Sequence, residues 1–199
     1  MMQMAHDTLA ELGDDALLAL YANGDGTAAR VLMGRLLPSV LRYAARILGD
    51  HAEAEDVAQE AMLRLWQVAR NWRQGEAQPK TWIYRVTANL CVDRLRARRR
   101  RAASNIDDIP EPEDPKHTVV VQMIEKDRLR ALDGALLQLP ERQRQAVVLR
   151  HIEGLSNPEI ATILDIGIEA VESLTARGKR NLQTILSGQK HAFGYDHED

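Results

Sequence analysis

Arginine is concentrated in one short stretch near the middle of the chain, VDRLRARRRR at residues 92–101. Six of these ten residues are arginine, although the whole chain carries a formal net charge of −3. Guanidinium groups stay charged at physiological pH and form paired hydrogen bonds with phosphate oxygens. The stretch therefore predicts contact with the phosphates of a nucleic acid.

No grouping of residues in the sequence predicts catalysis. The six histidines are scattered, and there is no HExxH motif, no nucleophile elbow and no phosphate-binding loop. The single cysteine, Cys91, excludes an internal disulfide and a CxxC metal pair, and its apolar neighbours favour a packed side chain. The acidic end of the chain, residues 196–199, is interpreted as a frayed tail and not as a metal site. We therefore expect no enzyme activity, no cofactor and no metal.

Composition predicts an all-helical protein. Aromatic residues make up only 4% of the chain, and leucine and alanine dominate its apolar residues, which favours helices over strands. The N-terminus lacks the basic start and apolar run of a signal peptide. No apolar stretch approaches the roughly 18 residues of a transmembrane helix. A cytoplasmic protein with no membrane contact of its own is expected.

The stretch HAEAEDVAQEAMLRLW, residues 51–66, has the pattern of an amphipathic helix. Its apolar residues recur at spacings of three and four, which predicts one buried stripe. Another side combines hydrogen-bond acceptors with one exposed apolar side chain, a mixture that suits a basic partner surface better than water. The residues on that side are Asp56, Gln59, Glu60 and Leu63. The alternative is an ordinary helix with a solvated acidic face.

Residues 81–101 predict another helix, with Thr81 as its N-cap after Pro79. An apolar stripe runs along one side, and four polar residues lie near one another on a different side. These are Arg85, Asn89, Arg96 and Arg99. Asparagine can bind adenine bidentately, and arginines near the helix end suit phosphates. Upstream, residues 28–49 also predict a helix, which Pro38 breaks or kinks.

Residues 156–186 have the pattern of a helix-turn-helix motif. Ser156 and Glu159 are the two members of a capping box at the start of the first helix, and the tripeptide DIG predicts the turn. The second helix is expected from about residue 168 to 186 and carries basic residues. Helical hairpins of this kind also occur in proteins that do not bind DNA.

Between these helical segments lies an acidic, proline-containing stretch, SNIDDIPEPEDPKH at residues 104–117. Proline removes backbone donors and disfavours helix in the residue before it, and repulsion between like charges favours an extended chain. A boundary between two domains is predicted here. The alternative is that this stretch is only a solvent-exposed spacer.

Three stretches, in a typical order and separation, resemble the extracytoplasmic-function (ECF) group of bacterial sigma factors in the sigma-70 family. AEDVAQEAMLRLW and TWIYRVTANLCVDRLRARRR are similar to parts of region 2, and LPERQRQAVVLRHIEGLSNPEIATIL followed by AVESLTARGKRNL is similar to region 4. The resemblance covers roughly residues 14–186 and implies an all-α protein of two small domains. The implied divisions are a flexible N-terminus at 1–13, a sigma-2 domain at 14–103, a linker at 104–122, a sigma-4 domain with the helix-turn-helix at 123–187 and a flexible tail at 188–199.

The resemblance implies a subunit that binds core RNA polymerase and directs it to promoters. The face at 56–63 would grip the clamp helices of the largest subunit, and region 4 would meet the flap of the second-largest subunit. The loop at 71–80 would hold a flipped base of the −10 element, although the preferred interpretation of Trp72 is a core anchor for that loop. The residues implied for the −10 element are Trp72, Arg73, Gln74, Gln78, Arg85, Asn89, Arg96, Arg98, Arg99 and Arg100.

The resemblance implies that the start of the helix-turn-helix motif and its recognition helix contact the −35 element. The implied residues are Ser156, Glu169, Glu172, Ser173, Ala176, Arg177 and Arg180. The sequence departs from the common family pattern here, because Asp165 replaces a turn glycine and Glu172 and Leu174 occupy positions that are often basic. Leu174 can pack inward or meet a partner. These departures leave open which residues read bases.

Control by an anti-sigma factor, in a stress or extracytoplasmic signal response, is also implied. Two other functions are weighed: a sigma-like mimic that titrates an anti-sigma factor without initiating transcription, and a one-component repressor. Sigma-like mimics carry an attached receiver domain and can lose their DNA-facing residues. This chain has no segment of the size of a receiver domain and keeps the arginine cluster, which counts against the mimic. The polar face at 56–63 and the lack of dimerising heptads count against the repressor.

Overall fold

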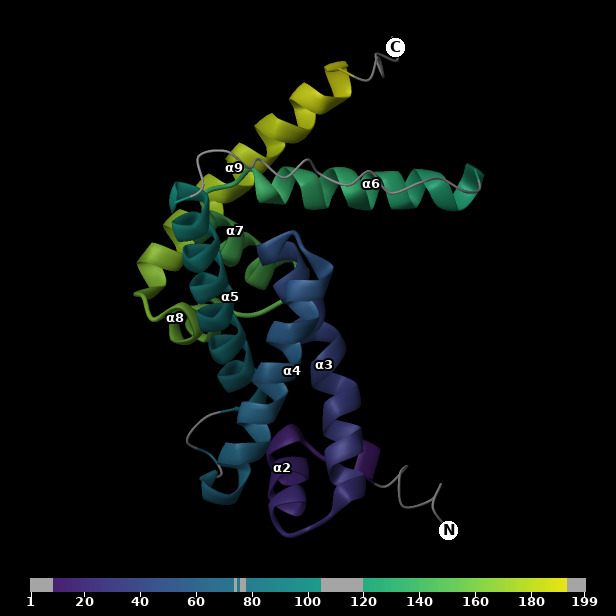
Figure 1. Ribbon diagram of the computed structural model, residues 1–199, viewed down its shortest axis with the longest axis vertical. Helices are drawn as coiled ribbons and strands as arrows, with labels where there is room; N and C mark the ends of the chain where they lie inside the picture. Colours follow the sequence, from purple (N-terminus) through teal and green to yellow (C-terminus); the bar gives the residue numbers. More distant parts are fainter. Residues whose placement is uncertain (1–8, 74, 76–77, 105–119, 193–199) are drawn as a thin grey trace.

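The computed structural model describes residues 9–73, 75, 78–104 and 120–192, and the regular secondary structure of these ranges is entirely helical. The all-α fold class predicted from composition is confirmed. Figure 1 shows the N-terminal half as a long bundle, with helices of the C-terminal half packed against its upper part. The elements in chain order are α2 (Asp14–Ala22), α3 (Gly26–Leu48), α4 (His51–Val68), the short 3-10 helix η1 (Ala69–Asn71), α5 (Pro79–Ser104), α6 (Val120–Leu137), α7 (Glu141–Val147), the π-helix η2 (Val148–Ile152), α8 (Asn157–Leu164) and α9 (Ile168–Ala192).

Helix α3 is long and continuous. Asp25 caps its start by accepting hydrogen bonds from two backbone N–H groups of the first turn, and Gly49 ends it in a left-handed conformation with a φ of 69°. Pro38 was predicted to break or kink the helix, and the break is wrong because the helix runs through this residue. Leu36 and Val40, on either side of it, are buried in the bundle core, and this packing outweighs the loss of one backbone hydrogen bond.

Helix α5 begins at Pro79, two residues before the predicted start at Thr81. Proline is well suited to the first helical position, since its missing N–H would have no partner there and its φ angle is already helical. Thr81 therefore lies inside the helix, almost buried, and the prediction that it caps the helix is wrong. The predicted apolar stripe is confirmed, with Ile83 fully buried and Val86 and Leu90 packed against the same core.

Helices α8 and α9 form the predicted helix-turn-helix. At the start of α8, the backbone N–H and the hydroxyl of Ser156 both donate to the Glu159 carboxylate, at 2.7 and 2.6 Å. In the turn, Asp165 has a φ of 53°, the left-handed conformation that a glycine more often supplies. Helix α9 continues past the predicted end at residue 186 to Ala192.

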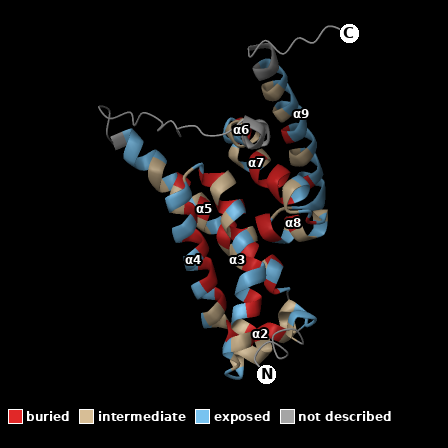
Figure 2. Cartoon of the chain, turned by 90° about the vertical axis from the view of Figure 1, so that its right-hand side faces the viewer, coloured by how far each residue is buried: buried red, intermediate tan, exposed pale blue. Residues whose placement is uncertain are grey.

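The two halves of the chain share one hydrophobic core, and Figure 2 shows part of it in red on α8 and on the bundle helices beside it. Tyr84 and Cys91 of α5 belong to the same buried cluster as Val148 of η2 and Ile160 of α8. A second cluster holds α2 against α3, α4 and the start of α5. The fold of two helical domains is confirmed, and the two domains pack directly on each other. Their exact boundaries stay predictions, because residues 105–119 of the expected linker lie outside the described residues.

Candidate nucleic-acid and polymerase interfaces

The predicted apolar stripe of α4 is buried and its polar face is exposed. On that face Leu63 is 57% exposed, so an apolar side chain lies among the polar ones. Asp56 Oδ2 lies 3.9 Å from Arg94 Nη1 of α5, and Glu60 Oε1 accepts a hydrogen bond from Arg64 Nε at 2.9 Å. The four predicted residues share this one exposed surface: Asp56, Gln59, Glu60 and Leu63.

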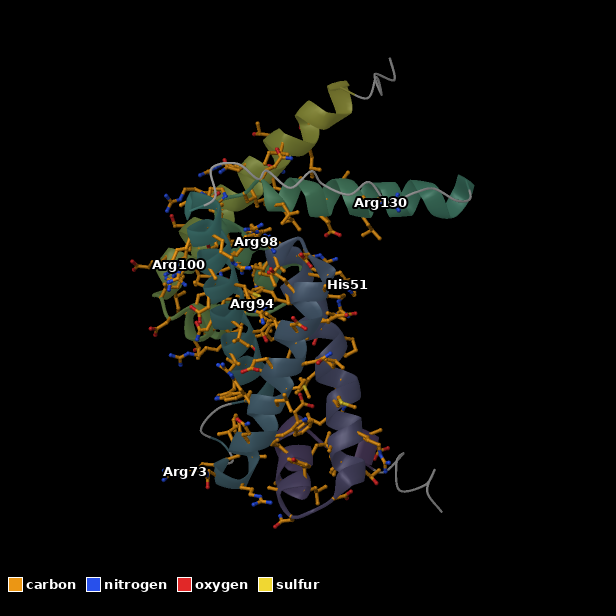
Figure 3. The ribbon with its side chains drawn as sticks, in the orientation of Figure 1. His51, Arg73, Arg94, Arg98, Arg100 and Arg130 are labelled. Carbon is orange, nitrogen blue, oxygen red and sulfur yellow. The ribbon has the colours of Figure 1, made fainter. Side chains whose placement is uncertain are left out.

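The arginines of α5 fall into two groups. Arg94 and Arg98 lie on the side of the helix that faces α4 (Figure 3). The Arg98 guanidinium donates to the backbone carbonyl of Leu48 at 3.1 Å and to Glu53 Oε2 at 2.8 Å. Arg98 therefore holds α5 to the end of α3 and the start of α4. This structural role was not apparent from the sequence, which assigned Arg98 to phosphates.

Three further arginines in the second half of α5 lie on another side of the helix. Arg96, Arg99 and Arg100 are exposed and line an open hollow together with Asp93. Arg99 Nη2 also donates to Glu141 Oε2 of α7 at 3.0 Å. A hollow lined by three arginine side chains is a favourable place for a phosphate group, because their guanidinium groups can bind its oxygens.

Two residues predicted to reach the −10 element lie nearer the start of α5. Arg85 and Asn89 are both exposed. Arg85 Nη2 nevertheless lies 4.0 Å from Oδ1 of Asp165, in the turn of the helix-turn-helix. The two predicted DNA-binding elements therefore lie against each other in this structure.

The loop before α5 is fixed by Trp72. Its indole Nε1–H donates to Asp15 Oδ1 of α2 at 3.0 Å, and its ring packs edge to face on a second tryptophan in α5, with centroids 6.0 Å apart. The interpretation of Trp72 as an anchor is therefore better supported than its interpretation as a wall of a base pocket. Arg73 and Gln78 are exposed, and Gln74 lies outside the described residues.

The predicted recognition surface is exposed, and the opposite side of α9 is packed. The exposed residues are Ser156 at the start of α8 and Glu169, Glu172, Ser173, Ala176, Arg177 and Arg180 of α9. Arg177 Nη2 donates to Ser173 Oγ at 2.6 Å, and Asn157 Nδ2 of α8 donates to Glu172 Oε1 at 3.4 Å. Leu174 is partly buried against the shared core, so it packs inward.

Burial governs the ionisation of two side chains in the shared core. It raises the pKa of the Cys91 thiol to about 12. It also raises the pKa of Tyr84, with a further contribution from the hydrogen bond to Glu153. Both groups are therefore protonated at neutral pH, where neither is an activated nucleophile.

The described part of the chain shows neither a metal site nor a membrane-spanning helix. Within it, no three histidine, cysteine, aspartate or glutamate side chains come together as a metal site would require. None of the helices described there is both long and apolar enough to cross a bilayer.

Sequence reasoning missed a polar contact between the two halves, centred on Glu153. Tyr84 Oη donates to Glu153 Oε2 at 2.6 Å, and Arg42 Nη2 lies 3.7 Å from the same oxygen. The Glu153 side chain is only 3% exposed. Tyr84 and Glu153 are 69 residues apart in the chain, so no local spacing signals the pair.

Two family models match the chain. The model of sigma-70 region 2 matches residues 32–101, and that of sigma-70 region 4 matches residues 129–182. The chain is 32% identical over 166 residues to the ECF RNA polymerase sigma factor SigL of Mycobacterium tuberculosis, and the match covers 83% of this chain and 92% of SigL. The chain belongs to the ECF sigma factors of the sigma-70 family.

This ECF sigma factor is also 36% identical over 160 residues to the ECF RNA polymerase sigma factor SigE of Mycolicibacterium smegmatis. That match covers 77% of this chain but only 58% of SigE, so the chain spans little more than half the length of that relative. Its fold is similar to that of the sigma factor RpoE from Bartonella quintana, solved in complex with the anti-sigma factor NepR. The TM-score is 0.65 at 23% identity, covering 78% of this chain and 94% of that chain. The family resemblance of the sequence motifs is confirmed.

Proposed function

We propose that this chain acts as an alternative sigma factor, which binds core RNA polymerase and directs it to promoters through their −10 and −35 elements. The observation that carries the proposal is the presence, on one chain, of three distinct exposed surfaces. These are an apolar anchor among acids on α4, an arginine-lined hollow on α5 and the outer face of a helix-turn-helix.

Docking on the polymerase is assigned to the exposed surface of α4. Leu63 supplies the apolar anchor, and burying its exposed part contributes about 1 kcal/mol. Asp56 and Glu60 flank it with negative charge, which favours a basic partner such as the clamp helices of the largest subunit. Region 4 is proposed to contact the flap of the second-largest subunit.

Recognition and opening of the −10 element are assigned to α5 and the loop before it. Arg85 and Asn89 can reach base edges, since both side chains are exposed. The hollow on α5 binds phosphates, which positions the helix without reading sequence. Trp72 fixes the loop, so that polar residues of the loop can surround a flipped base. The loop residues proposed for that role are Arg73, Gln74 and Gln78.

Recognition of the −35 element is assigned to α9, with its N-terminal turns leading into the major groove. Arg177 and Arg180 bind the DNA backbone, and Glu172 accepts a hydrogen bond from a cytosine amino group. Ser173 and Ala176 lie between them on the same exposed surface. Ser156 and Glu169 lie at the starts of α8 and α9, where their exposed side chains can meet the DNA.

An anti-sigma factor and a cytoplasmic location complete the proposal. RpoE, which has the same fold, was solved with its anti-sigma factor NepR bound. A cytoplasmic location follows from the proposed partner, because core RNA polymerase and promoter DNA are found there.

The second candidate function, a mimic that only titrates an anti-sigma factor, is not favoured because the surfaces for DNA are retained.

The proposal is tested by transcription with purified core RNA polymerase and a promoter library. The chain should direct initiation at a defined set of promoters. Replacing Asp56 and Glu60 together by arginine should abolish binding to core polymerase, because like charges would then face each other at the interface. The far-UV circular dichroism spectrum should be unchanged, because both residues are exposed.

Glu55→Arg provides the control for this double variant. Glu55 is also an exposed acid of α4, about 100° around the helix from Asp56. The control should keep core binding and transcription. Transcription by the double variant at the level of the control would contradict the docking surface. Tight binding to an anti-sigma factor without initiation at any promoter would favour the mimic.

A further inference from the structure

Two side chains from different helices of the helix-turn-helix meet on its surface. Asn157 is the first residue of α8, and Glu172 lies on the outer face of α9, 15 residues further along the chain. Asn157 Nδ2 donates to Glu172 Oε1 at 3.4 Å. Both residues lie within the stretch that matches sigma-70 region 4, so the contact belongs to the helix-turn-helix itself.

The backbone is held in place on both sides of this contact. The capping box fixes the start of α8, where Ser156 donates twice to the carboxylate of Glu159. Next to Glu172 in α9, Val171 is fully buried in the shared core. The contact therefore joins two fixed backbone positions, and its main effect is to restrict the rotation of the Glu172 side chain.

The group that holds Glu172 is a neutral amide, so the carboxylate keeps its negative charge. Asn157 occupies Oε1, which leaves Oε2 able to accept a hydrogen bond from another donor. Glu169, three residues earlier on α9, has the same charge and disfavours a swing of Glu172 toward it. An ionised carboxylate only accepts hydrogen bonds, so it suits the amino group of cytosine and is repelled by the O6 and N7 acceptors of guanine.

We propose that Asn157 is a positioning residue for base recognition: its amide holds the Glu172 carboxylate toward a cytosine amino group and so determines the base preference at one position of the −35 element. The inference rests on the proposed function, in which α9 enters the major groove. Without the amide, the Glu172 side chain samples other rotamers and can turn away from an unfavourable base. Asn157 therefore contributes to specificity more than to overall affinity.

Transcription by the full-length chain with core RNA polymerase tests the proposal. The templates are copies of one promoter in which each −35 position carries each of the four bases in turn. The wild type should prefer cytosine over guanine at one position by about five- to tenfold, and Glu172→Ala should remove this preference while keeping those at the other positions. A wild-type chain that initiates at promoters but has no such position would contradict this inference alone.

Asn157→Ala should reduce the cytosine preference at that position by about threefold or more, because the carboxylate is no longer held. In a chain that already carries Glu172→Ala, it should have no further effect on this preference, since Asn157 acts through that side chain. An unchanged preference in Asn157→Ala would overturn the proposal. A further loss in the double variant would also overturn it, because Asn157 would then contact the base itself.

Asn157→Asp separates positioning from helix stability. Aspartate has nearly the shape of asparagine and is favourable in the first turn of a helix, so thermal unfolding should not occur at a lower temperature. It cannot donate when ionised and its charge repels Glu172, so the cytosine preference should fall at least as far as in Asn157→Ala. The added charge weakens binding to all templates alike, and the ratio between bases is therefore the quantity measured. A retained preference would contradict the assigned hydrogen bond.

Thr162→Ala is the matched control in α8. Thr162 is exposed, and its hydroxyl donates to the backbone carbonyl of Pro158 in the same helix. This variant should keep the base preference at every position. A loss of cytosine preference equal to that of Asn157→Ala would show that any disturbance of α8 has this effect, and the positioning role would be wrong.

Nuclear magnetic resonance of the free full-length chain separates this proposal from the proposed function. The side-chain amide signals of Asn157 should shift in Glu172→Ala, because the amide loses its acceptor. Unchanged signals would contradict the contact and leave the proposed function intact. Failure of the wild-type chain to initiate at any promoter would contradict the proposed function, and with it the inference that rests on it.

Discussion

Arg96 and Arg98 are two residues apart on α5, yet their side chains have different surroundings. Arg98 reaches Leu48 and Glu53 across the bundle, whereas Arg96 borders the open hollow. Successive helical residues are rotated by about 100°, so a run of arginines along a helix must point both toward the packed side and away from it. Some arginines of the cluster at 92–101 therefore stabilise the fold, and others face the open hollow.

We expect Arg98→Ala to lower the free energy of unfolding by about 1 kcal/mol. Hydrogen bonds to charged groups contribute more than this when buried, but the Arg98 side chain is partly exposed to solvent. Urea denaturation of the free chain measures the effect. An unchanged transition midpoint would contradict the assigned structural role.

We expect Arg96→Ala to leave stability unchanged and to weaken holoenzyme binding to all promoters alike. The loss of one phosphate contact should reduce the salt slope of binding by about one. Fluorescence anisotropy at several salt concentrations measures this slope. A loss confined to certain promoter sequences would instead mean that Arg96 reads bases.

At the scale of elements, α9 crosses α7 very closely at Gly178. A Cβ atom at this position would lie 2.6 Å from Val147 Cγ2 and 3.2 Å from the carbonyl oxygen of Gln143. Glycine is unfavourable in a helix interior, so its presence here is explained by the close approach of the two helices. The position of the recognition helix therefore depends on this missing side chain.

Gly178→Ala should destabilise the protein by about 1–3 kcal/mol, because overpacking outweighs the better helix propensity of alanine. Gly188→Ala in the same helix is the control, since nothing lies within 4 Å of its added methyl group. The control should be stabilised by about 0.5–1 kcal/mol. Thermal unfolding of both variants provides the comparison, and stabilisation by Gly178→Ala would contradict the crossing geometry.

The capping pair of α8 predicts a pH dependence of stability. Hydrogen bonds from Ser156 lower the pKa of the Glu159 carboxyl in the folded state. Its stabilisation is therefore complete above the unfolded pKa, about 4.3, and is lost as the pH falls through the lower folded pKa. Between about pH 6 and pH 3, the wild type should lose this contribution and Glu159→Gln should not. Chemical denaturation across this range measures the difference, and identical pH profiles would contradict it.

At the scale of the whole molecule, local patterns predicted the elements but not the way in which they meet. The buried stripe of α4 was predictable because the spacing of apolar residues along a helix directly reflects which side is buried. The start of α8 was predictable because Ser156 and Glu159 interact within one helical turn. The Tyr84–Glu153 contact joins residues far apart in the chain, so no pattern could indicate it. Pro38 was misjudged for a related reason, since packing on both sides of it decides whether the helix continues.

The position of α6 sets a limit on the spacing of promoter elements that this chain can span. Its end is fixed to α3, where Asp133 pairs with Arg46 at 3.2 Å and Leu137 packs on Gly49, and Figure 1 shows its other end far from the bundle. If these contacts break, α6 adds about 27 Å of rigid length, and the 15 residues at 105–119 add at most about 50 Å. Elements about 25 base pairs apart lie about 85 Å apart on straight DNA, a distance that this tether of about 77 Å covers once the widths of the two domains are added. In the proposed function, the length of this tether therefore sets an upper limit on the promoter spacing that the chain can span.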